Sequence, residues 1–133
     1  MMTFEDFERL AGEEPGLAET LNKAAAAAGR TRQAPGTFEP VTTMAGMAAL
    51  VILFPIVNRI VQKVGLPWVE SVGRYSEMWR AEFERWMDEQ HENHGFDPVA
   101  TKAASETLLH ELEGTTDDAA REPWERLMGL VRK

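Results

Sequence analysis

The residues best suited to hold a metal ion or to move a proton are gathered in one short stretch. It reads HENH at positions 91–94, and Asp88 precedes it by about one helical turn. Histidines at positions i and i+3 share one face of a helix and could both reach one cation. The chain has no Cys and no HExxH pattern, and Gly95 places the pair where a helix is expected to end. We therefore interpret His91 and His94 as a solvated helix terminus, with a metal site as the weaker alternative.

Other chemically active residue types lack the spacing that catalysis needs. The serines have no accompanying His and Asp in a recognisable arrangement, and the glycines form no phosphate-binding loop. Neighbouring carboxylates are common in a chain with 22 Asp and Glu, and they are expected to face solvent. We expect a non-enzymatic protein with no catalytic residue, no cofactor and no small-molecule substrate.

Composition limits the possible partners. A formal net charge of −8 argues against binding to nucleic acid and against electrostatic docking on anionic lipid, because both depend on Lys and Arg. The absence of Cys excludes disulfides and thiolate chemistry. A length of 133 residues suits one helical domain, or a small soluble part with one membrane span. Protein partners in a larger complex are the expected ligands.

The element that organises the chain is an apolar helix predicted at about 43–64, within an apolar segment 43–66. No charged residue lies between Glu39 and Arg59. The uncharged interval 40–58 is longer than a typical core helix and slightly shorter than the roughly 20 apolar residues of a membrane span. Pro55 is tolerated more easily in a membrane helix than in the interior of a soluble one. Ala45 and Ala49, with Gly46 beside them, would let a neighbouring helix approach closely.

A long amphipathic helix is predicted next, at about 67–93. Large apolar side chains recur on it at spacings of three and four residues, which places them on one face. The opposite face is mainly acidic, unlike the basic face of helices that lie on membranes. We expect this aromatic stripe to pack on protein, either as core or as a docking face. Its members are Trp68, Val72, Tyr75, Trp79, Phe83 and Trp86.

The rest of the chain is predicted to be helical as well. Residues 1–29 form a short helical hairpin whose second helix stops at Gly29, and 30–42 are a Pro- and Gly-containing linker. The region 67–133 is helical, with Asp97 and Pro98 opening one helix and Pro123 in the first turn of the last. The fold class is therefore all-α, with five or six helices around one apolar central helix.

Two functions from different classes fit these elements. The first is a single-pass membrane accessory subunit, a structural protein that holds partners through the small residues of its span and through the aromatic stripe. The second is a cytoplasmic, soluble and acidic binding module, such as an inhibitor, a phage or defence accessory, or an assembly chaperone, with 44–64 as a buried core helix. We favour the first on the length of the apolar run. Under the second, Ile52→Asp should unfold the protein, because an unpaired buried charge is strongly destabilising.

Overall fold

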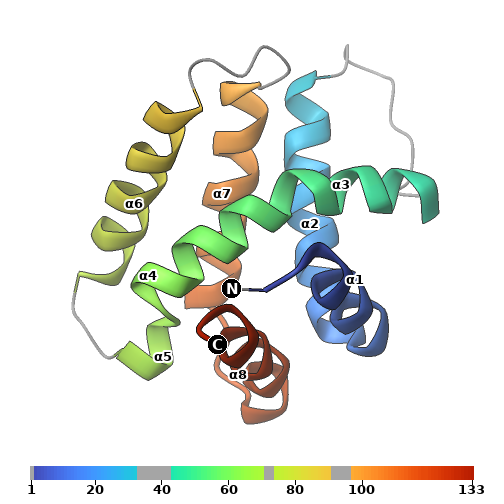
Figure 1. The fold of residues 1–133 in the computed structure, drawn as a ribbon, viewed down its shortest axis with the longest axis vertical. Helices are drawn as coiled ribbons and strands as arrows, with labels where there is room; N and C mark the ends of the chain where they lie inside the picture. Colours follow the sequence, from blue (N-terminus) through green and yellow to red (C-terminus); the bar gives the residue numbers. More distant parts are fainter. Residues whose placement is uncertain (1, 33–42, 71–73, 91–96) are drawn as a thin grey trace.

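The computed structural model of the chain describes residues 2–32, 43–70, 74–90 and 97–133 (Figure 1). Residues 30–32, 43–49 and 70 are described by their backbone alone. The described residues form helices and no strand, which confirms the predicted all-α class.

Counting the continuous central helix once, and leaving aside the single-turn α5, the described chain has six helices, as predicted. In chain order they are α1 (Phe4–Glu13), α2 (Pro15–Arg32), α3 (Thr43–Ile56), the π-helical turn η1 (Val57–Val61), α4 (Gln62–Val64), α5 (Pro67–Glu70), α6 (Tyr75–Glu89), α7 (Pro98–Glu113) and α8 (Asp118–Val131).

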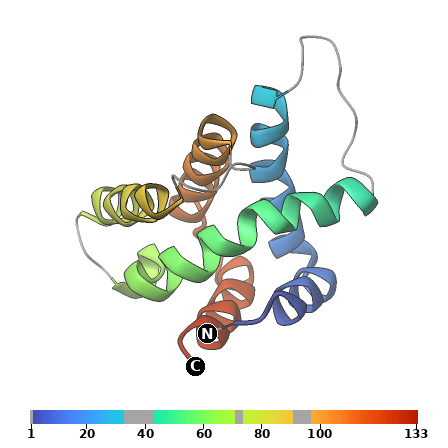
Figure 2. The ribbon, with the colours of Figure 1, turned by 45° about the horizontal axis from the view of Figure 1, so that its top comes forward.

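The central helix consists of α3, η1 and α4 and covers the predicted range 43–64. It crosses the molecule diagonally, with α2 and α7 on one side of it, α6 near one end, and α1 and α8 below (Figures 1 and 2). Pro55 does not break it. Proline has no N–H to donate and its ring crowds the preceding turn, but the helix continues through it, and a π-helical turn begins two residues later.

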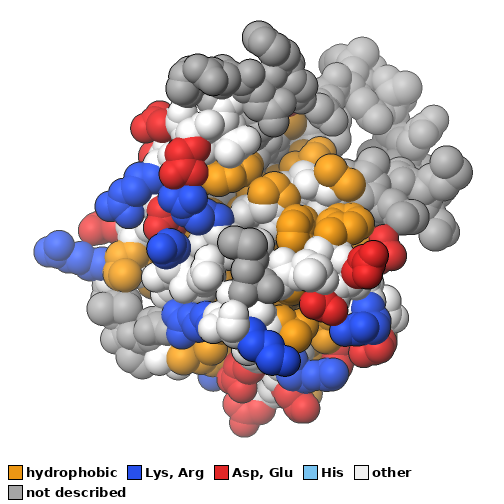
Figure 3. Space-filling view, in the orientation of Figure 1, with side chains coloured by type: hydrophobic (Ala, Val, Ile, Leu, Met, Phe, Trp, Pro, Cys, Tyr) orange, Lys and Arg blue, Asp and Glu red, His pale blue; other side chains and the backbone are white. Residues whose placement is uncertain are grey.

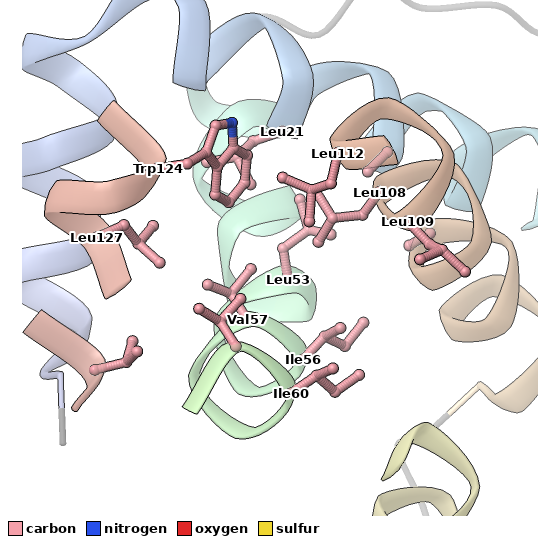
Figure 4. Packing of buried hydrophobic residues seen from close by; sticks show 14 of the residues in the cluster. Leu21, Leu53, Ile56, Val57, Ile60, Leu108, Leu109, Leu112, Trp124 and Leu127 are labelled. Atoms are coloured by element: carbon pink, nitrogen blue, oxygen red, sulfur yellow. The ribbon is translucent and has the colours of Figure 1, made fainter. Parts of the chain in front are cut away.

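The core gathers around the C-terminal half of the central helix. Leu53 faces Leu108 and Leu112 of α7, and Trp124 of α8 closes the same space (Figure 4). Burial of each such side chain stabilises the fold by about 1.5–3 kcal/mol. The completely buried members from the central helix are Leu53, Ile56, Val57, Ile60 and Val61, each with an exposed fraction of 0%.

The second helix lies alongside α7 over much of its length (Figure 1). It continues past Gly29 to Arg32, so the predicted stop at Gly29 is wrong. Glycine in a helix interior costs only about 1 kcal/mol relative to alanine, and packing of the Ala-rich face on α7 can offset that cost. The rest of the predicted linker lies outside the described residues.

The segment predicted as one helix at 67–93 is divided. Gly65 has φ 83°, a left-handed conformation that favours glycine, and it turns the chain from α4 toward α5. Arg74, with φ −123° and ψ 29°, is not helical and precedes α6. The Tyr75 hydroxyl donates a 2.6 Å hydrogen bond to the Gly65 carbonyl, so the start of α6 is fixed against the turn.

Candidate functional site

The predicted metal pair, His91 and His94, lies outside the described residues. Within the part of the chain that is described, no group of three or more His, Cys, Asp or Glu side chains could hold a metal ion. Any metal argument therefore still depends on the sequence pattern alone.

The aromatic stripe forms the inner face of α6. Tyr75, Trp79, Phe83 and Trp86 have exposed fractions of 0–7% and belong to the core of this chain. The Trp79 indole donates a 2.9 Å hydrogen bond to the Ser105 hydroxyl of α7, so its polar atom is satisfied inside the core. Val72 lies outside the described residues. In this arrangement the four aromatic side chains contact the chain's own helices, and their use by a partner stays a prediction.

Trp68, the first member of the stripe, lies apart from the others on α5. Its indole nitrogen donates a 2.9 Å hydrogen bond to the Glu125 carboxylate of α8. The Arg121 guanidinium lies 5.2 Å from the centre of its ring, within the range of a cation–π interaction. Trp68 thus joins α5 to α8 and keeps only part of its ring in solvent.

A cluster of charges joins the π-helical turn to α6. The Arg59 guanidinium donates two 2.9 Å hydrogen bonds to the two Glu89 carboxylate oxygens, and its Nε lies 3.6 Å from Oε2 of Glu82. Glu82 is only 6% exposed, and the hydrogen bonds to Glu89 raise the pKa of Arg59. The same bonds lower the pKa of Glu89. No periodicity in the sequence pairs residues 30 positions apart, so sequence reasoning missed this cluster.

This charge cluster fastens two helices and offers little room for chemistry. Oε2 of Glu82 and Nε of Arg59 are buried without a hydrogen-bond partner, but they already face each other as an ion pair. Arg85 approaches the other Glu82 oxygen at 3.8 Å. The carboxylate is therefore neutralised within the fold, and we assign the cluster a structural role.

Part of the exposed apolar surface lies on the central helix, just before its buried C-terminal half. Val51 is 61% exposed, and Leu50 and Phe54 beside it are half-buried. The Phe54 ring meets the edge of Phe4 from α1 at a centroid distance of 5.6 Å. Figure 3 shows hydrophobic side chains gathered over α3, with acidic side chains over α1 next to them. We call Phe4, Leu50, Val51, Phe54 and Pro55 the α3 surface.

The predicted small-residue contact lies immediately before the α3 surface. Ala45, Gly46 and Ala49 belong to the first half of α3, where the backbone alone is described. In both views this half of α3 extends beyond α2 (Figures 1 and 2). Their use as a helix-packing contact stays a prediction.

The apolar run continues from α3 into the buried part of the central helix. Among the described residues, the segment Leu50–Val69 is long and apolar enough to cross a membrane. Core helices of soluble proteins pass the same test of length and composition, and 44% of this segment is buried within the fold.

A shallow pocket of about 300 Å³ lies between α1 and α8. Leu10 and Leu130 contribute its apolar lining, and its charged lining residues include Arg9 and Arg126. Arg9 pairs with Asp6 at 2.9 Å, and Arg126 pairs with Glu14. Because both guanidinium groups already have carboxylate partners, the pocket has no free charge poised for a ligand among its described arginines.

Comparison with known proteins gives no family. No protein-family model matches the chain, and neither a curated protein nor a solved structure matches it significantly. Function is therefore inferred from the geometry of the described residues.

Proposed function

We propose that this chain is a non-enzymatic, acidic protein-binding module, in which the central helix forms the core of a helical bundle and the α3 surface is left for a partner. The observation that carries the proposal is the contrast between neighbouring positions of one apolar helix. Leu53, Ile56 and Ile60 are completely buried, whereas Val51 is 61% exposed.

Burial of the C-terminal half favours the bundle over a membrane span. To cross a bilayer, the helix would have to exchange its contacts with α2, α7 and α8 for lipid. Arg59 would also have to leave Glu89 or carry that carboxylate with it. Both changes oppose insertion, whereas the observed packing already buries the same apolar side chains within the fold.

Exposure of Val51 on α3 supports a binding role. Isolated exposed apolar side chains are ordinary, but contiguous ones mark protein or membrane contacts. On the α3 surface Val51 is exposed, and the half-buried Leu50 and Phe54 beside it pack against the core and leave part of each side chain in solvent. The aromatic stripe of α6 is buried in the core. The α3 surface is therefore the better candidate for holding a partner.

A single-pass membrane accessory subunit is the second candidate. It is favoured by the length and the mean hydropathy of 1.4 of the segment Leu50–Val69. Under this candidate the central helix would be extracted from the bundle, and the aromatic stripe of α6 would become free to hold protein partners outside the bilayer.

Fractionation of the full chain distinguishes the two candidates. We expect the protein in the supernatant after a carbonate wash of the membranes, and a monodisperse species in detergent-free buffer at high ionic strength. The matched variant is Lys63→Leu, which removes an exposed charge from the segment Leu50–Val69, leaves the Arg59–Glu82 ion pair intact and would favour insertion. Recovery of the natural chain in the washed membrane would overturn the binding-module proposal and favour the accessory subunit.

A further inference from the structure

We propose that the α3 surface docks a partner helix that is apolar on one face and basic along its flank. This inference rests on the proposed function and adds the chemistry of the partner. Its starting point is the position of Val51, which stands on the outer side of the central helix while Leu53, two residues later, lies wholly within the core.

The shape of the region fits a helical partner. Its apolar positions Leu50, Val51, Phe54 and Pro55 are three and four residues apart along α3, so they form a strip that runs along the helix. An amphipathic helix that settles on an apolar face is a common mode of peptide recognition.

The charge beside the surface selects a basic flank. Helix α1 carries four acidic residues and one Arg, and Glu8 lies one helical turn after Phe4, which contacts Phe54. Glu5 follows Phe4 directly and is exposed. The chain as a whole has a net charge of −8. A basic partner is therefore attracted to this face, and attraction of this kind raises association rates and specificity.

The same charge disfavours two other occupants. A second copy would bring another acidic α1 and another net charge of −8 to the contact. A bilayer containing anionic lipid would repel the acidic side chains beside the surface. A protein helix with Lys or Arg on its flank is not repelled by these acidic side chains.

The test uses two synthetic helical peptides with the same Leu face, one flanked by Lys and the other by Glu. Binding to the full chain is followed by fluorescence anisotropy at low salt. We expect the Lys-flanked peptide to bind at least about tenfold more tightly than the Glu-flanked peptide, and this preference to shrink as salt is added.

Two valines give a matched pair of variants. Val51 on α3 is 61% exposed and Val99 on α7 is 66% exposed, so each accepts Lys without disturbing the core. Val51→Lys and Val99→Lys change the net charge equally. We expect the first to weaken binding of the Lys-flanked peptide by more than about tenfold, and the second to change it by less than about twofold. Val51→Ser, which adds no charge, should weaken binding as well.

Several results would overturn the inference. They are equal binding of both peptides, equal effects of the two Lys variants, or tight binding that survives Val51→Ser. Capture by anionic or zwitterionic vesicles, or self-association in sedimentation, that is lost in Val51→Lys would assign the surface to lipid or to a second copy. If the chain stays in the supernatant but binds both peptides alike, the proposed function stands and only this inference fails.

Discussion

Leu53 and Val51 are close neighbours in one apolar run, yet their surroundings are opposite. Leu53 is 0% exposed and Val51 is 61% exposed. We expect Leu53→Ala to lower the free energy of unfolding by about 2–5 kcal/mol, because the cavity adds to the lost burial. Val51→Ala should change it by less than about 0.5 kcal/mol. Urea unfolding of the two variants measures both values, and similar losses at the two positions would contradict this packing.

The ionisation of Glu89 makes the stability of the fold depend on pH. Its hydrogen bonds with Arg59 hold its pKa below the usual range. A carboxylate with a lowered folded pKa stabilises the fold above its unfolded pKa, and that contribution is lost as the pH falls through the folded value. We expect Glu89→Gln to lower the urea midpoint at about pH 7 and to have a smaller effect at about pH 3. Glu84→Gln, at an exposed position of the same helix, is the control.

A constant difference between wild type and Glu89→Gln at the two pH values would show that the ion pair does not contribute through the charge of Glu89. A pH-dependent loss shared equally by Glu84→Gln would instead point to the general acidity of α6.

Several single residues could be predicted from the sequence because their effects are local. Thr3 accepts a 3.1 Å hydrogen bond from the Asp6 amide as the N-cap of α1. Asp97 does the same for the Ala100 amide, with Pro98 at the first position of α7. The substitution Ile52→Asp would not place a charge in the core, because Ile52 is half-buried. A run without polar residues carries no periodicity to tell Ile52 from Leu53.

At the scale of elements, prediction succeeded where a pattern was strong and failed where tertiary packing decided. The bounds of the central helix, 43–64, and the aromatic face of α6 followed from hydrophobicity and spacing. Pro123 is inside α8 rather than in its first turn, because Asp117 caps the helix earlier. The break before α6 and the ion pairs between helices depend on residues far apart in the chain, which a local pattern does not contain.

The attachment of α6 to α7 is testable through one hydrogen bond. Ser105 is 2% exposed and accepts the bond from the Trp79 indole at 2.9 Å. Ser105→Ala leaves a buried N–H without this acceptor, and we expect a loss of about 1–3 kcal/mol in the free energy of unfolding. Thermal or urea unfolding measures the loss, and Ser76→Ala, on the part of α6 that remains half-exposed, is the control. A loss shared by both variants would mean that the buried bond contributes nothing of its own.

At the scale of the whole molecule, one core joins the N-terminal helices to the C-terminal ones. Leu21 of α2, Leu53 of the central helix and Leu112 of α7 meet in the same cluster (Figure 4). The sequence predicted helices and an apolar centre, but not which of the described side chains of that centre would be covered. That outcome depends on where α1, α2 and α7 pack, and it determines whether the apolar run is available to a partner.

The π-helical turn at Val57–Val61 changes how the central helix is wound. A wider turn holds one more residue than a regular one, so the side chains that follow are rotated by about 100° relative to those that precede. The helix is in effect two segments on one axis with different phases, α3 presenting Val51 outward and α4 burying Val64, while Arg59 reaches Glu89 from within the turn itself. Loss of one residue from this turn would restore regular winding and realign the two segments.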